Sequence, residues 1–261
     1  MSFRIQKIQA IRQKLKLGVP SIGSWLQIPH SSVAEILGQS GYDWIVVDME
    51  HGSISTHQLP DLFRSLELGN TLPLVRLAQG QPKDCKQALD AGAGGIIIPM
   101  VENADQLQKV IQASQWPPSG SRGVGFSRAN LFGKHFTEYA KEAQAPLVVA
   151  QLEHIRGVEN LKDILSVKGL DALFIGPYDL SASMGLTGQF EHNDFQEALN
   201  RVLKICKQHK VSSGVHVVYP DPNKLQLRIE EGYRFIAYSI DSVFLVQSSQ
   251  NPDEMNWNKK N

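Results

Sequence analysis

Apolar residues fall into eight short runs along this chain, and each run is apolar throughout instead of alternating with polar positions. Such runs are typical of parallel strands buried on both faces. After each run comes a segment in which apolar residues recur every three or four positions, the pattern of an amphipathic helix. The predicted strands are Ser21–Gln27, Trp44–Met49, Leu72–Leu77, Gly95–Met100, Leu147–Leu152, Ala172–Ile175, Ser213–Val218 and Phe235–Ile240.

Eight strand–helix alternations without a Pro- or Ser-rich linker predict an α/β fold, a single (β/α)8 barrel domain over residues 1–261. Residues 3–16 form an additional predicted helix, which we expect to close the bottom of the barrel. The long connection Ser114–Ala145 contains the polar, Gly-rich segment Ser121–Ala129, which we expect to lie over the active face. The clearest helices after the strands are predicted at Ser32–Leu37, Gln58–Leu68, Lys83–Asp90, Ala104–Ala113 and Phe195–His209.

Composition narrows the classes of partner. The 26 Lys and Arg residues equal the 26 Asp and Glu residues, so charge favours neither nucleic acid nor an anionic membrane. The chain has no apolar run of membrane-spanning length and no N-terminal signal pattern, so we expect a soluble cytoplasmic protein. Cys85 and Cys206 both fall in helical patterns and are expected to be reduced thiols.

Two consecutive apolar runs, Pro146–Glu153 and Ala172–Asp179, each end on a carboxylate. The segment Gly157–Ser166 between them reads as a short helix, and a right-handed crossover places both carboxylates on the same rim of the sheet. Two oxygen ligands suit a divalent cation that keeps water and leaves room for substrate. Mg²⁺ or Mn²⁺ fits best, and Co²⁺, Ni²⁺ or Zn²⁺ could occupy the same site. Surface salt bridges are the alternative for either carboxylate alone.

Two further side chains near strand ends carry potential chemistry. His51, in the sequence Asp48-Met-Glu-His-Gly52, suits a general base, or alternatively a structural histidine. Arg76 ends an apolar strand and must meet an anion, which is either a buried ion-pair partner or a substrate enolate. The remaining candidates are expected to be structural or surface histidines: His30, His57, His154 and His216.

The sequence lacks the residues that three other kinds of barrel or nucleotide-binding enzyme need. No lysine ends a predicted strand, which argues against a Schiff-base aldolase. The first strand is followed by no G-x-G-x-x-G sequence, which argues against dinucleotide binding. The seventh and eighth strand ends lack the Gly-rich phosphate cradle of sugar-phosphate barrels.

Taken together, the strand-end motifs resemble the HpcH/HpaI aldolase family, the metal-dependent class II pyruvate aldolases. The matching motifs include Gly23-Ser-Trp-Leu26, Asp48-Met-Glu-His-Gly52, Leu74-Val-Arg76, Gln151-Leu-Glu153 and Ile175-Gly-Pro-Tyr-Asp179. The resemblance implies a lyase that reversibly cleaves a 4-hydroxy-2-oxo acid to pyruvate and an aldehyde. It also implies a barrel whose last helix is exchanged between subunits, in a hexamer built as a trimer of dimers.

Carried onto this chain, the resemblance implies a role for eight residues. Glu153 and Asp179 match the metal ligands, and Arg76 matches the arginine that stabilises the enolate. His51 matches the catalytic histidine and Asp90 the aspartate that pairs with it. Gln151 and the peptide nitrogens around Tyr178 and Asp179 match positions that bind the pyruvoyl group, and Trp25 matches an aromatic near the pocket. Tyr178 is bulkier than the small residue often found at its position, and the seventh strand end also departs from the family pattern.

Two other functions remain open. One is a related lyase that acts on a CoA ester, as citryl-CoA lyases do. The other is a barrel that binds a metabolite without turnover. Oxaloacetate decarboxylation would pass through the same pyruvate enolate as aldol cleavage, and would be a side activity of that chemistry.

Overall fold

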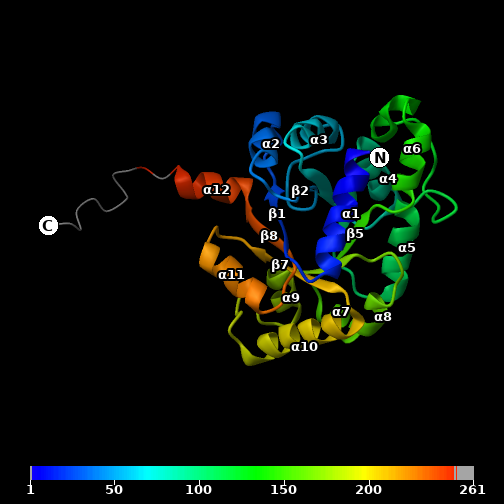
Figure 1. Ribbon diagram of the computed structural model, residues 1–261. Coiled ribbons are helices and arrows are strands. Elements are labelled where there is room, and N and C mark those ends of the chain that lie inside the picture. The colour runs from blue at the N-terminus through cyan, green and yellow to red at the C-terminus, as the bar shows by residue number, and fades with distance from the viewer. Residues whose placement is uncertain (1, 250, 252–261) are drawn as a thin grey trace.

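The eight predicted strands close into a parallel barrel in the computed structural model, which describes residues 2–249 and 251 (Figure 1). Every strand pairs with the next one in the chain, and β8 pairs with β1. Several strands end one or two residues before their predicted ends, where the chain leaves the ladder and forms a loop. The strands are β1 (Ser21–Leu26), β2 (Trp44–Asp48), β3 (Leu72–Arg76), β4 (Gly95–Ile98), β5 (Leu147–Leu152), β6 (Ala172–Ile175), β7 (Ser212–Val217) and β8 (Phe235–Ile240).

Helices surround the barrel and confirm the predicted amphipathic segments (Figure 1). The predicted helix at 157–166 is two short helices that meet at Asn160, although its apolar positions are buried as expected. The helices of the first half are α1 (Phe3–Lys16), α2 (Ser31–Gly38), α3 (Leu59–Leu68), α4 (Pro82–Ala91), α5 (Ala104–Ser114) and α6 (Phe136–Ala143). Those of the second half are α7 (Ile155–Glu159), α8 (Leu161–Leu165), α9 (Pro177–Ser183), α10 (Asn193–His209), α11 (Pro222–Glu230) and α12 (Asp241–Ser248).

Two apolar layers hold the fold together. The outer layer lies between the strands and the surrounding helices, and it takes the outward side chain of each strand. The inner layer fills the barrel and includes Trp44, stacked on Phe235 with ring centroids 4.2 Å apart. Ile8, Ile11 and Leu15 of α1 join this inner layer, so α1 closes the barrel as predicted.

The segment Ser121–Ala129 does not lie over the active face, contrary to the prediction. It connects a helix to a strand, and such connections meet the barrel at the amino ends of the strands. Arg122 pairs with Asp90 near the end of α4, and Arg128 donates to the carbonyl of Ala91. These contacts place the segment beside the ends of α3 and α4, on the face opposite the carboxyl ends of the strands.

Cys85 and Cys206 are free, as predicted, and both are buried, which raises the pKa of each thiol to about 12. A membrane-crossing helix, long and apolar enough to span a bilayer, does not occur in the part of the chain that the structure describes.

Candidate active site

A pocket of about 220 Å³ opens at the carboxyl ends of the strands. This is the end at which barrel enzymes carry their chemistry, because each strand delivers its last side chains there. Seven of the eight predicted site residues line the pocket: Trp25, His51, Arg76, Gln151, Glu153, Tyr178 and Asp179. The residues implied by the resemblance therefore converge, with the exception of Asp90.

Arg76 is held in place by two carboxylates from the end of β2. Its Nε and Nη2 donate to the two oxygens of Asp48 at 2.9 and 2.6 Å, and its Nη1 lies 3.0 Å from Glu50 Oε2. Burial alone would raise the pKa of Asp48, but the guanidinium outweighs it and lowers that pKa. This arrangement fixes the position of the guanidinium before any substrate binds.

Asp48 also shapes the loop that carries His51. Its Oδ1 accepts hydrogen bonds from the backbone N–H groups of Glu50 and His51, and its Oδ2 accepts one from Gln27 Nε2 at 2.9 Å. The sequence analysis gave Asp48 no role of its own. Its place at the end of an apolar strand, level with Arg76 on the next strand, was the signal that could have identified it.

Glu153 is the most perturbed acid of the site. Its Oε2 accepts from the backbone N–H of Met100 at 3.0 Å, and its Oε1 accepts from Gln151 Nε2 at 2.6 Å. Burial raises the pKa of Glu153 to about 7, and repulsion from Glu50 and Asp179 adds to this effect. The ionised form is therefore costly in the absence of a nearby cation.

Space beside Glu153 depends on Gly176. A Cβ on Gly176 would lie 2.5 Å from Glu153 Oε1, so a larger residue would displace the carboxylate. The chain then enters α9, whose first turn carries Asp179. Consecutive strands β5 and β6 thus bring both predicted metal ligands to one edge of the pocket, as the crossover predicts.

The donor set fits a hard divalent cation with open coordination positions. Glu153 and Asp179 supply carboxylates, and the amide oxygen of Gln151 is buried and accepts no hydrogen bond within the described residues. Across residues 2–249 and 251, no group of three or more His, Cys, Asp and Glu side chains is arranged to hold a metal. Any cation held here would rely on water and substrate for the rest of its shell.

Part of the pocket wall is aromatic and includes a histidine that the sequence analysis set aside. The His216 ring stacks on Trp25 at 5.1 Å between centroids, and Arg76 lies 5.5 Å from the Trp25 ring. His216 Nε2 donates to the carbonyl of Ser239 at 3.0 Å, and burial lowers the pKa of His216 to about 4. His216 is therefore a neutral ring on the pocket wall.

The other histidines agree with a structural role. His30 Nδ1 accepts from the backbone N–H of Ser32 at the start of α2, and His154 Nδ1 accepts from that of Arg156 at the start of α7. His57 Nδ1 lies 2.8 Å from the hydroxyl of Ser55.

His51 and Asp90 are not brought together within one chain. The His51 side chain is 58% exposed, and its nearest carboxylate is Glu50, with Nε2 and Oε2 4.0 Å apart. Asp90 lies near the end of α4, at the opposite end of the barrel, and pairs with Arg122 at 3.1 Å. A helix that follows a strand returns the chain to the amino end of the barrel, so the two residues sit at opposite ends.

Comparison with known proteins identifies the family. The profile of the HpcH/HpaI aldolase/citrate lyase family matches residues 21–248. A hydroxypyruvate/pyruvate aldolase of Roseobacter denitrificans is 35% identical over 246 residues, which cover 93% of this chain and 95% of that protein. A 4-hydroxy-2-oxo-heptane-1,7-dioate aldolase of Shigella flexneri is 32% identical over 244 residues, covering 92% and 90%.

A solved structure gives the same result. A HpcH/HpaI aldolase/citrate lyase family protein from Burkholderia cenocepacia superposes with a TM-score of 0.86 at 34% identity, over 92% of this chain and 96% of that one. The barrel and these similarities confirm the resemblance seen in the sequence and the aldolase type of lyase that it implied. The chain belongs to the HpcH/HpaI aldolase/citrate lyase family.

Proposed function

We propose that this protein catalyses the reversible, divalent-metal-dependent aldol cleavage of a 4-hydroxy-2-oxo acid to pyruvate and an aldehyde. The observation that carries the proposal is the placement of Arg76 in the same small pocket as Glu153 and Asp179. A fixed cation facing a pair of carboxylates suits a substrate that binds a metal and develops negative charge as its carbon–carbon bond breaks. The names of the two curated relatives support the same chemistry.

Glu153 and Asp179 would hold the cation, with Mg²⁺ or Mn²⁺ favoured by the oxygen ligands. When bound, the cation would polarise the 2-oxo group of the substrate as a Lewis acid. The raised pKa of Glu153 supports this role, because a cation would remove the penalty that burial and the neighbouring acids impose on its ionised form.

Arg76 would stabilise the negative charge of the enolate. Asp48 and Glu50 keep the guanidinium oriented, so little reorganisation is needed when charge develops. Loss of one well-placed donor of this kind typically costs about 3–4 kcal/mol of transition-state stabilisation.

The pyruvoyl group would lie against Gln151 and the start of α9. The backbone N–H groups of Tyr178 and Asp179 have no hydrogen-bond partner among the described residues and are free to bind it. The pocket volume of about 220 Å³ lies below the range of about 300–1,000 Å³ common for drug-sized ligands, which favours a short aldehyde. Tyr178, 56% exposed, would narrow the mouth from one side.

His51 would take the proton of the 4-hydroxyl group, through a water molecule, as the exposed base at the pocket. Asp90 lies at the other end of its own barrel, so its proposed pairing with His51 would have to form between subunits. Glu50, on the same loop as His51, is the carboxylate that approaches the ring within one chain.

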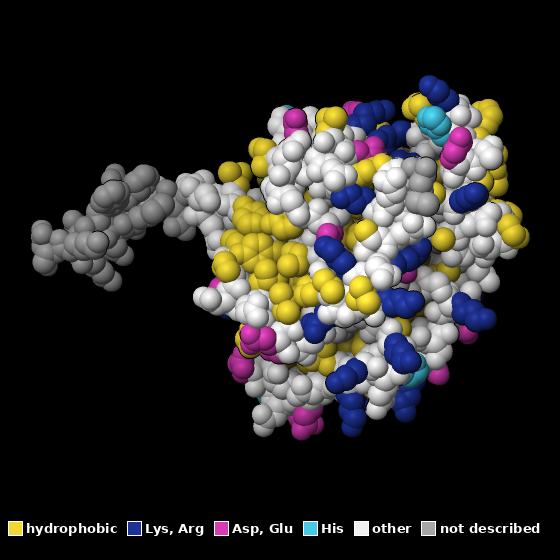
Figure 2. All heavy atoms as spheres, viewed as in Figure 1, with side chains coloured by type: hydrophobic (Ala, Val, Ile, Leu, Met, Phe, Trp, Pro, Cys, Tyr) yellow, Lys and Arg dark blue, Asp and Glu magenta, His cyan; other side chains and the backbone are white. Residues whose placement is uncertain are grey.

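Assembly into an oligomer is part of the proposal. The helix α12 projects away from the barrel (Figure 1), and Asp241 is its one buried residue within the described range. Leu245 and Val246 are exposed, and a continuous apolar surface lies beside this helix (Figure 2). Exchange of α12 between subunits, in a trimer of dimers, would cover these side chains. Light scattering measures the mass of the assembly in solution: a hexamer agrees with the proposal, and a monomer contradicts it.

The alternative of a CoA-ester lyase needs cations near the pocket for the CoA phosphates. The basic hollow described below lies at the amino ends of the strands, at the opposite end of the barrel. A CoA ester reacting beside Glu153 would not reach it. Turnover of a CoA ester with no activity on free 2-oxo acids would nevertheless reverse the proposal, and metal-dependent ligand binding without turnover would indicate a binding protein.

Arg76→Ala should strongly slow proton exchange between pyruvate and deuterated water. Exchange requires only enolate formation, so the methyl NMR signal of pyruvate reports it without knowledge of the aldehyde. We expect Mg²⁺- or Mn²⁺-dependent exchange that EDTA stops and that falls by about 10²–10³-fold in Arg76→Ala. Arg64→Ala, at an exposed arginine on α3, is the matched control and should retain the exchange. Absence of exchange with every metal would contradict the proposed function.

His51→Ala should slow aldol cleavage while leaving metal binding intact. A general base typically contributes about 10²–10⁴-fold to the rate, and His51 is not a proposed ligand. Cleavage rate and Mn²⁺ affinity would be measured on the same preparation. Equal loss of both quantities would remove the assigned role.

Glu153→Gln should change how stability depends on pH in the metal-free protein. Wild-type Glu153 holds its proton more tightly when folded, with a pKa of about 7 against 4.5, so folding stability falls as pH rises through this window. Glutamine does not titrate, so the variant should gain up to about 3 kcal/mol relative to wild type between pH 4.5 and pH 8. Urea unfolding in EDTA measures the difference in unfolding free energy between the variant and wild type. If that difference does not change with pH, the ionised form of Glu153 is not destabilised by folding.

A further inference from the structure

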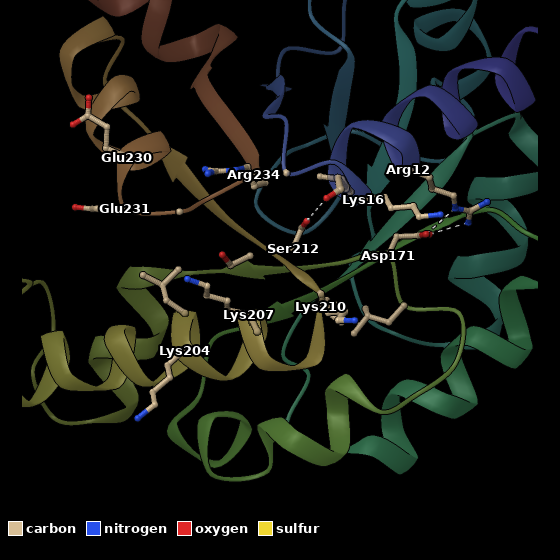
Figure 3. A pocket seen from close by; sticks show the side chains of 18 residues that line it. Arg12, Lys16, Asp171, Lys204, Lys207, Lys210, Ser212, Glu230, Glu231 and Arg234 are labelled. Atoms are coloured by element: carbon tan, nitrogen blue, oxygen red, sulfur yellow. Dashed lines mark hydrogen bonds and ion pairs between the residues drawn. The ribbon is translucent and has the colours of Figure 1, made fainter.

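A larger hollow, of about 1070 Å³, lies at the opposite end of the barrel from the active site (Figure 3). Its lining includes the first residues of β7 and the residues just before β6 and β8, together with the end of α1 and the last turns of α10. The mechanism uses none of these residues. Nothing in the aldolase chemistry therefore explains why the hollow is there.

The hollow is strongly basic, although the chain as a whole carries no net charge. Its three acids are Asp171, Glu230 and Glu231, and its six cations are Arg12, Lys16, Lys204, Lys207, Lys210 and Arg234. Arg12 is fully engaged by Asp171, with contacts of 2.7 and 2.9 Å. Glu231 pairs with Arg228, outside the hollow. The other five cations of the hollow have no carboxylate within 4.0 Å among the described residues.

The carboxyl-terminal ends of three helices offset part of this positive charge. Lys16 and Lys207 lie in the last turns of α1 and α10, and Arg234 donates to the carbonyls of Ile229 and Tyr233 near the end of α11. Each helix end is equivalent to about half a negative charge, so three ends offset about one and a half of the net three positive charges. A positive potential remains in the hollow after the helix ends are neutralised.

The cations also have a definite arrangement. In Figure 3, Lys207 and Arg234 point to one side of Ser212, and Lys16 and Lys210 point to the other. Lys204, on the same helix as Lys207, points away from the hollow (Figure 3). Anionic groups at more than one place would be needed to contact both sets, as in a chain of phosphates.

Between the charged groups, Leu15, Leu170, Leu203 and Val211 add apolar surface to the lining, and Ser212 and Ser213 add two hydroxyl groups. A volume near the upper end of the range for small-molecule sites, with an apolar wall beside separated cations, suits a phosphorylated organic molecule better than a free ion. We propose that this hollow binds an organic diphosphate or triphosphate, with Lys207 and Lys210 contacting the phosphates.

The test is calorimetric titration with ADP in EDTA, so that no metal carries the nucleotide to the active site. Lys207→Gln/Lys210→Gln should weaken ADP binding by about tenfold to a hundredfold, because it removes two charge-assisted contacts. Lys204→Gln is the matched control and should bind as wild type does. Arg76→Ala should also bind ADP normally. No turnover is involved, so the result is independent of the proposed aldolase activity.

A second measurement uses the wild-type chain and avoids any question of variant folding. ADP should protect Lys207 and Lys210 from acetylation, read by mass spectrometry, while Lys204 is modified equally with and without ADP. Absence of ADP binding would overturn the proposal. Equal weakening by Lys204→Gln, or loss of binding in Arg76→Ala, would overturn it as well, by indicating general charge attraction or binding at the active site.

Discussion

The active end of this barrel is organised around one buried carboxylate, that of Glu153, which forms no salt bridge among the described residues. Glu153 lines the pocket and accepts two hydrogen bonds, and burial together with Glu50 and Asp179 raises its pKa to about 7. The charge of Arg76 offsets this rise only in part, and Asp48 and Glu50 already engage the guanidinium. The site thus holds four carboxylates, those of Asp48, Glu50, Glu153 and Asp179, around the single guanidinium of Arg76. The proposed divalent metal would offset this negative charge, and the substrate enolate would lie between the metal and Arg76.

The two proposed sites lie at opposite ends of the barrel. The carboxyl ends of the strands carry Arg76, Glu153, Asp179 and His216, all close to the aromatic wall of Trp25. The amino ends are closed by α1, whose apolar face completes the inner core, and they carry the basic hollow between α1, α10 and α11. A ligand at the amino end would be separated from the reacting atoms by the full height of the packed barrel interior.

Much of this architecture could be predicted from the sequence, because the strands are uniformly apolar and each is followed by an amphipathic helix. The positions of Glu153 and Asp179 followed from the same pattern, since a right-handed crossover brings consecutive strand ends to one rim. Two placements show where such reasoning stops. The segment Ser121–Ala129 was expected over the active face, yet it precedes a strand and therefore lies at the opposite end. Asp90 lies near the end of a helix for the same reason, so connectivity alone separates it from His51 within one chain. His216 escaped notice because a single polar residue in an apolar strand does not reveal which face of the strand it occupies.

The most direct test of this account is the number of protons released when Mn²⁺ binds, measured by calorimetry in buffers of different ionisation enthalpy. With a pKa of about 7, Glu153 is mostly protonated at about pH 6 and must give up its proton to become a ligand. The account predicts release of nearly one proton at about pH 6, almost none at about pH 8.5, and no such release in Glu153→Gln. Mn²⁺ binding with the same proton count at both pH values, or no Mn²⁺ binding at all, would contradict the claim that a strained carboxylate organises this site.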